Sequence, residues 1–210
     1  MTNNVQLLPI GDSLTNQKPW ITELKTLSNN LITTVGTRGK TNSHEGRSGA
    51  SASFYINTSG NASYSYDNSY NSVGSDAQDF STSNTYKVGD YCKKDFTFGT
   101  GIYKAVYVFT KEHTGEWSDD DVYCLSTGNP FYDYTNKCFS MNFYKSNNNI
   151  SYNAIFIYLG TNGISLTPET NNNGSLGIKT LIDNIRTEDA NTPIIVINTI
   201  FKSGQNGIGN

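Results

Sequence analysis

The sequence predicts an α/β fold, in which helices cover a parallel sheet, with a small β module inserted into it. Short apolar runs alternate with segments of helical periodicity at both ends of the chain, which is the pattern of parallel strands joined by crossover helices. The middle of the chain breaks this alternation, first with a polar stretch and then with a strand-rich one. With 210 residues, the chain is long enough for one such domain and a module.

The first strand is predicted over Val5–Ile10, a mostly apolar run that stops at Gly11 and carries Pro9 where ladder pairing ends. Pro19 then opens an amphipathic helix, since apolar residues follow it at mostly three- and four-residue spacing. These residues are Trp20, Ile21, Leu24, Leu27 and Leu31. A second strand is expected at about Leu31–Val35.

The C-terminal region repeats this pattern. Ala154–Leu159 is a nearly continuous apolar run, typical of a parallel strand that is covered on both faces. A helix is predicted next, because apolar residues recur at i, i+3, i+4 and i+7 from Ile178 to Ile185. The last strand is predicted at Pro193–Asn198, so helices again precede strands and right-handed crossovers are expected.

The middle of the chain divides into two parts. Residues 57–84 are dominated by Ser, Asn, Tyr, Gly and Asp, which predicts an exposed loop or a disordered linker. Residues 85–126 contain the strand-like run Ile102–Phe109 and predict a small β insert. The expected α/β domain therefore comprises residues 1–56 and 127–210.

Composition argues against several classes of partner. A net charge of −3 with 15 Lys and Arg gives no electrostatic footprint for nucleic acid, and no basic amphipathic helix suggests a membrane surface. No apolar run approaches the roughly 20 residues of a membrane span, and no signal peptide is recognisable. Three cysteines without CxxC spacing predict free thiols rather than a zinc site or a disulfide framework. We expect neither a metal nor a cofactor.

The stretch IGDSLT places Ser13 on a tight turn between the first strand and a helix. This position would present its hydroxyl at the carboxyl edge of the sheet, where open α/β folds bind ligands. The alternative is that Ser13 only caps the helix. Two later segments bear on this choice: Gly49 could bring a backbone N–H close to an oxyanion, and Asn162 could add an amide donor after a later strand.

In this order, Gly11–Thr15, Gly46–Gly49 and Gly160–Asn162 resemble the first three blocks of the SGNH hydrolases, also called the GDSL esterase/lipase superfamily. The resemblance covers about residues 3–56 and 127–210. It implies a flavodoxin-like three-layer fold, with Ser13 as nucleophile and an oxyanion hole formed by the Ser13 N–H, the Gly49 N–H and the Asn162 side chain.

Longer stretches, residues 36–39 running into 44–47 and later 128–131, are similar to SGNH domains of phage tail and bacterial proteins. His44 matches a histidine of those relatives. Asp12, His44 and Arg47 are therefore further candidates for substrate binding, and a structural role for His44 is the alternative.

The chain departs from the family at its fourth block, the Asp-x-x-His that supplies the general base. The sequence contains only His44 and His113 and has no counterpart of that block. Without an imidazole on its hydroxyl, Ser13 is a weak nucleophile. We therefore expect a truncated SGNH fold that lacks its last strand and helix and is inactive as given. His113 belongs to the insert and is expected to have no catalytic role.

The insert has a resemblance of its own. Tyr86–Tyr91, Tyr103–Ala105 and His113–Trp117 are similar to the small chitin-binding type of carbohydrate module. This resemblance makes Tyr86, Tyr103 and Trp117 candidates for stacking on sugar rings. The alternative is that these rings form the core of the insert, because so small a unit needs its aromatic residues inside.

Two functions from different classes follow. The first is an SGNH-type serine esterase that deacetylates a surface polysaccharide and lacks its catalytic histidine in this chain. The second is a non-catalytic carbohydrate-binding or receptor-recognition protein of a phage tail; an incomplete product without activity is a third possibility. The expected partners are a polysaccharide or acylated glycan and other phage tail proteins, and the expected location is a virion tail or the extracellular space.

Overall fold

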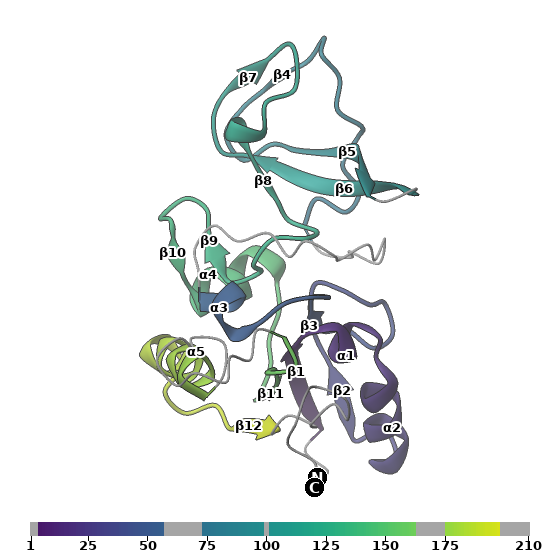
Figure 1. Ribbon diagram of the computed structural model, residues 1–210, viewed down its shortest axis with the longest axis vertical. Helices are drawn as coiled ribbons and strands as arrows, with labels where there is room; N and C mark the ends of the chain where they lie inside the picture. Colours follow the sequence, from purple (N-terminus) through teal and green to yellow (C-terminus); the bar gives the residue numbers. More distant parts are fainter. Residues whose placement is uncertain (1–3, 57–72, 99–100, 163–174, 198–210) are drawn as a thin grey trace, which may run out of the picture.

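The computed structural model describes residues 4–56, 73–98, 101–162 and 175–197 (Figure 1). Its main sheet has five strands: β1 (Val5–Gly11), β2 (Ile32–Thr34), β3 (Glu45–Gly46), β11 (Ala154–Tyr158) and β12 (Ile194–Ile197). The strand order is β12-β11-β1-β2, and β3 also pairs with β1. The pairings between these strands are parallel. The predicted α/β class with a parallel sheet is confirmed.

The register of β1 brings three strand ends to one level. Gly11, the last residue of β1, is paired with Tyr158 of β11 on one side and with Gly46 of β3 on the other. β2 pairs only with Val5–Leu7 at the start of β1. The strand predicted at about Leu31–Val35 is β2, and β3 is a further short strand that pairs with β1 on the same side, closer to its end.

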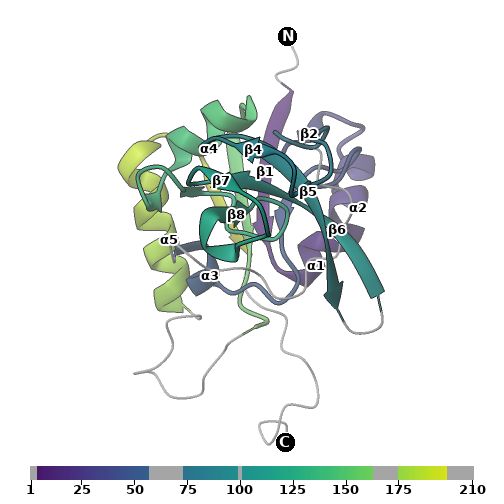
Figure 2. The same cartoon turned by 90° about the horizontal axis from the view of Figure 1, so that it is seen from above.

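Helices cover both faces of the sheet. α2 (Pro19–Leu27) lies on one face, where Trp20 stacks on Phe156 with ring centroids 4.4 Å apart. α3 (Ala52–Ile56), α4 (Met141–Asn148) and α5 (Ser175–Glu188) belong to the other side, and α5 and α2 flank the sheet from opposite sides (Figures 1 and 2). Leu27 and Leu31 lie off the predicted apolar face, since they are 73% and 45% exposed.

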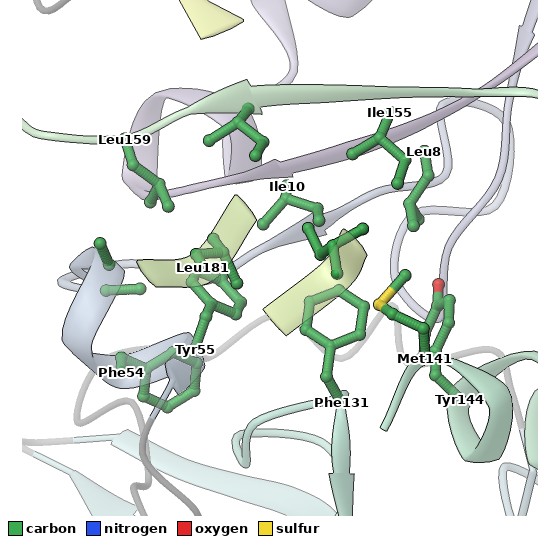
Figure 3. Close-up of a cluster of buried hydrophobic side chains, with 14 residues drawn as sticks. Leu8, Ile10, Phe54, Tyr55, Phe131, Met141, Tyr144, Ile155, Leu159 and Leu181 are labelled. Atoms are coloured by element: carbon green, nitrogen blue, oxygen red, sulfur yellow. The ribbon is translucent and has the colours of Figure 1, made fainter. Parts of the chain in front are cut away.

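The larger core lies between the sheet and α3, α4 and α5 (Figure 3). Apolar residues that alternate along β1 and β11 point into it, as a pleated strand requires. Fully burying an aliphatic side chain of this size contributes about 1.5–3 kcal/mol, so the sheet and these helices stabilise one another. The core includes Leu8, Ile10, Tyr55, Phe131, Met141, Tyr144, Ile155, Ile157, Leu181 and Ile185.

The insert forms a separate group of strands at one end of the molecule (Figure 1). β5 (Tyr91–Phe98), β6 (Gly101–Phe109) and β8 (Val122–Cys124) make an antiparallel sheet, and β4 (Thr85–Tyr86) pairs with β7 (His113–Thr114). A 3-10 helix, η1 (Asp119–Asp121), precedes β8. Part of the predicted linker, residues 57–72, lies outside the described residues, and the following segment contributes Phe80 to the aromatic core of the insert.

A short hairpin of β9 (Tyr132–Asp133) and β10 (Cys138–Phe139) leads from the insert to α4. The three cysteines are free thiols; Cys92 and Cys124 are buried and Cys138 is exposed. At the far edge of the sheet, β12 leaves Ile195, Val196 and Ile197 between 39% and 50% exposed. Among the described segments, no helix is long and apolar enough to cross a membrane.

Candidate active site

Ser13 begins α1 (Ser13–Asn16), directly after the end of β1. The N-cap of this helix is Asp12, whose Oδ1 accepts a hydrogen bond of 2.9 Å from the Leu14 N–H. The alternative that Ser13 is the cap is therefore wrong. Ser13 is half-buried, and within the described part of the chain its hydroxyl has no hydrogen-bond partner. The hydroxyl is thus not committed to capping.

The turn after β11 contacts the turns that follow β1 and β3. The Thr161 hydroxyl donates to the Asp12 carboxylate, and the Asn162 side-chain amide donates to the Ala50 carbonyl at 3.0 Å. The turns after β1 and β3 also meet directly, because the Asn16 amide donates to the Ser48 hydroxyl at 3.2 Å. Ser13, Gly49 and Asn162 therefore lie on three turns that are tied together at one edge of the sheet.

Gly49 sits in the turn after β3 with φ of +76°, a left-handed conformation that favours glycine. It is exposed, and its N–H donates to no other residue in the described ranges. Asn162 donates one amide hydrogen to Ala50, which fixes the orientation of the amide and leaves its second hydrogen available. Two of the three predicted oxyanion donors, the Gly49 N–H and the second amide hydrogen of Asn162, are thus uncommitted and lie on neighbouring turns.

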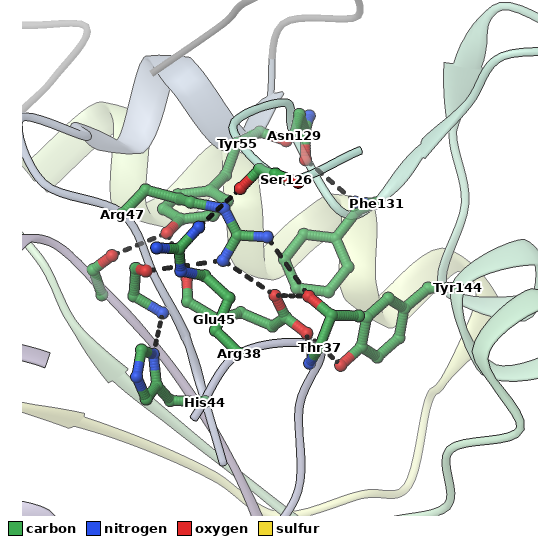
Figure 4. A network of polar contacts seen from close by, with 12 residues as sticks. Thr37, Arg38, His44, Glu45, Arg47, Tyr55, Ser126, Asn129, Phe131 and Tyr144 are labelled. Atoms are coloured by element: carbon green, nitrogen blue, oxygen red, sulfur yellow. Dashed lines mark hydrogen bonds and ion pairs between the residues drawn. The ribbon is translucent and has the colours of Figure 1, made fainter. Parts of the chain in front are cut away.

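Beneath this edge lies a buried polar network centred on Glu45 (Figure 4). The Glu45 carboxylate accepts from the Thr37 N–H at 2.5 Å, from the Thr37 hydroxyl at 2.8 Å and from the Tyr144 hydroxyl at 2.7 Å. It also forms a 3.0 Å ion pair with Arg47, and both side chains are completely buried. Burying a carboxylate is unfavourable unless it is paired and hydrogen-bonded, and here both conditions hold.

Tyr55 connects this network to the strand ends. Its hydroxyl lies 2.6 Å from the Gly11 carbonyl and also contacts the Glu45 carbonyl. Gly11 accepts a second hydrogen bond of 3.0 Å from the Arg47 N–H. Burial raises the pKa of the Tyr55 phenol far above its usual value, so the group remains a donor at neutral pH. Tyr55 and Arg47 thus hold the ends of β1 and β3 together below the two turns.

The remaining predicted binding residues of this region lie under the edge and not on its surface. Arg47 is 0% exposed, and Asp12 is 1% exposed with both carboxylate oxygens bonded within the protein. His44 is also buried, with its Nδ1 accepting a 2.9 Å hydrogen bond from the Gly46 N–H. Asp12, His44 and Arg47 were expected to contact substrate. They are buried in this structure, where a substrate does not reach them, and they have structural roles.

In the insert, Tyr86 belongs to the aromatic core. It is 7% exposed and stacks on Phe109 with ring centroids 4.3 Å apart. For Tyr86, the alternative that the ring fills the core of the insert is therefore the correct one. Trp117 is half-buried against Tyr107, its Nε1 donates to Asp119 at 2.7 Å, and the Lys94 ammonium lies 4.8 Å from its ring centroid. Tyr103 stands on β6, and its side chain lies outside what the structure describes.

His113 is paired within the insert. Its Nδ1 lies 3.0 Å from Asp121, its side chain is 5% exposed, and its ring stacks on Phe109. The hydrogen bond from His113 lowers the pKa of the Asp121 carboxyl. β7, which carries His113, lies at the opposite end of the molecule from α1 (Figure 1).

Sequence reasoning missed the residues that hold the turns together. Thr161 and Asn16 are short polar residues next to the recognised blocks, and only the fold shows what they contact. Glu45 lies within the recognised stretch 44–47 but was given no role, and Tyr55 belongs to no recognised stretch. The one available signal was a cluster of charged residues within 38–47, which is unusual beside a buried strand.

Across the described ranges, no group of three or more His, Cys, Asp or Glu side chains could hold a metal ion. No family model, curated protein or solved structure matches the chain.

Proposed function

We propose that this chain carries the site of an SGNH-type serine esterase that removes acetyl groups from a surface polysaccharide. The observation that carries the proposal is the set of contacts joining the turns after β1, β3 and β11, on which Ser13, Gly49 and Asn162 stand. The sheet order supports a flavodoxin-like frame. If β3 and the strands of the insert are left out and the remaining strands are renumbered, β2-β1-β11-β12 becomes 2-1-3-4, which is how the flavodoxin order begins.

In this proposal the Ser13 Oγ attacks the acetyl carbonyl carbon and gives its proton to a general base. The oxygen of the tetrahedral intermediate accepts hydrogen bonds from the Gly49 N–H and the Asn162 amide. The sugar oxygen then leaves as an alcohol after taking the proton back from the base. Water hydrolyses the acetyl-serine, which releases acetate and restores the Ser13 hydroxyl.

The general base of the family is the histidine of its Asp-x-x-His block, and this sequence has no such block. His113 is buried in the insert, and the Nδ1 of His44 already accepts from Gly46. The proposal is therefore that the three turns form the nucleophile and oxyanion parts of the site. Because removing a triad member typically costs several orders of magnitude in rate, the chain alone should be a very slow esterase.

Chemical rescue tests this proposal. Hydrolysis of an acetylated polysaccharide is measured with increasing free imidazole, and the rate with Ser13→Ala is subtracted to remove catalysis by imidazole itself. We expect a Ser13-dependent rate that rises with imidazole. Asn162→Ala should lower it about 10²–10³-fold, the usual loss for one oxyanion donor.

Asn142→Ala, a change at an exposed position of α4, is the matched control and should leave the rate unchanged. The proposal fails if imidazole adds nothing beyond the Ser13→Ala rate, or if Asn162→Ala and Asn142→Ala behave alike.

A second candidate is a non-catalytic glycan-binding or receptor-recognition protein of a phage tail. The observation in its favour is that both histidines of the sequence already have partners within the fold. Binding of a glycan by a protein that shows no imidazole-dependent hydrolysis would select this candidate.

A further inference from the structure

We infer that a groove between α4 and the insert is a binding site for a neutral glycan, separate from the turns that carry Ser13. The groove is open, has a volume of about 630 Å³ and is lined by Gly36, residues 73–76 and residues 147–150. Its volume falls within the range of roughly 300–1,000 Å³ that is typical of ligand sites. Figure 1 shows α4 and β9 between the sheet and the strands of the insert.

The lining of the groove is rich in uncommitted polar groups. Within the described ranges, the side chains of Ser75, Asp76 and Asn149 have no hydrogen-bond partner, and Asp76 and Asn149 are exposed. Together they offer a hydroxyl, a carboxylate and an amide. These groups both donate and accept hydrogen bonds, as sugar hydroxyls require.

Aromatic rings adjoin the polar groove. Asn147 and Asn148 also line a small neighbouring cavity of about 20 Å³, whose other walls include Tyr123, Tyr132, Tyr134 and Phe143. The Tyr134 ring lies edge-on to Phe143 with centroids 5.1 Å apart. A cavity of this size holds about one water molecule, so sugar rings would lie in the groove itself and not in this cavity.

Both walls of the groove adjoin regular elements of the fold. On one wall, Gly74 packs so closely on β5 and β6 that an added Cβ would lie 2.9 Å from the Tyr91 ring and 3.0 Å from Val106. On the other wall, Asn149 ends α4 in a left-handed conformation with φ of +51°.

The charge of the lining selects the class of ligand. No lysine, arginine or histidine is among the described residues that line the groove or the adjoining cavity, and Asp76 is the charged residue there. A phosphate, sulfate or uronic acid would meet a carboxylate and no cation, which disfavours binding. The lining therefore disfavours anionic sugars, and a neutral oligosaccharide suits its combination of hydroxyl, amide and carboxylate groups.

Calorimetric titration of the whole chain tests this inference. The probes are maltotriose, xylotriose and tri-N-acetylchitotriose as neutral sugars and trigalacturonic acid as the acidic one. We expect at least one neutral trisaccharide to bind and the acidic one not to bind. Asp76→Ala should weaken binding about tenfold, because it removes a charged acceptor. Asn149→Gly should weaken it about two- to tenfold while suiting the left-handed backbone.

Two matched variants control for unspecific effects. Asp120→Ala removes an exposed carboxylate of the insert, and Asn29→Gly changes an exposed asparagine with φ of +49° beside α2; both should bind as the parent does. Ser13→Ala should also bind normally, which separates this site from the proposed esterase. Failure of all three neutral sugars to bind, preference for the acidic sugar, or equal effects of the groove and control variants would overturn the inference.

Discussion

The buried ion pair of Glu45 and Arg47 allows a quantitative prediction for Arg47→Met. Methionine keeps much of the length of the arginine side chain but removes its charge, and it leaves Glu45 buried with the donors Thr37 and Tyr144. Both partners of the pair are 0% exposed, so solvent cannot replace the lost charge. Breaking a buried pair from one side costs about 3–5 kcal/mol.

A loss of this size is a large part of the roughly 5–15 kcal/mol that stabilises a typical domain. At about 2–4 °C per kcal/mol for a chain of this length, the melting temperature should fall by roughly 6–20 °C. Urea unfolding followed by circular dichroism measures the free energy of unfolding. The double variant Glu45→Gln with Arg47→Met should lose less than the two single variants added together, because they share one interaction. Strict additivity, or a loss below about 1 kcal/mol for Arg47→Met, would refute the reasoning.

Two further predictions concern other parts of the chain. Cys138 should react with a thiol reagent in the native protein, whereas Cys92 and Cys124 should react only on unfolding. Both of these thiols are buried, and burial raises the pKa of Cys92 to about 11. Fast labelling of all three thiols in the native protein would contradict this. The carboxyl of Asp121 should titrate below its usual range, since the hydrogen bond from His113 lowers its pKa. The ionised Asp121 carboxyl therefore stabilises the fold fully at pH values above its pKa in the unfolded chain. This stabilisation is lost as the pH falls through its lower pKa in the folded protein. Nuclear magnetic resonance titration should find a higher pKa for Asp121 in His113→Phe than in the parent, although Lys111 still lowers it, and an unchanged pKa would count against the pairing.

The periodicity of the sequence was sufficient to predict the parallel sheet. Apolar runs at Val5–Ile10 and Ala154–Leu159 indicated its central strands because each is covered on both faces, and such strands are recognisable without knowledge of their neighbours. The Gly-Asp turn before Ser13 was also recognisable, since the residues that form it are adjacent in sequence. Local patterns therefore identified the frame and the position of the serine.

The roles of charged residues were harder to predict. Arg47 was a candidate for substrate contact because it lies in the stretch 44–47, which resembles SGNH domains. Its burial depends on Glu45, which in turn depends on Tyr144, 99 residues further along the chain. The partners that make it possible to bury a charge come together only in the folded protein, so no local pattern in the sequence reveals them.

The same limit applied to the insert. An aromatic residue in a small β unit can stack on a ligand or fill the core, and the sequence does not distinguish the two. Tyr86 proved to be core because Phe80, from the segment predicted to be a linker, stacks on it at 5.5 Å.

The central claim is that the turns after β1 and β11 are held together beside Ser13. A double-mutant cycle of Asp12→Ala and Thr161→Val measures this contact, since valine keeps the shape of threonine and the cycle cancels the separate loss of the helix cap. We predict a coupling free energy of about 1.5–3 kcal/mol, as expected for a hydrogen bond to a charged group. A coupling of zero would show that the two turns do not meet and would contradict the account.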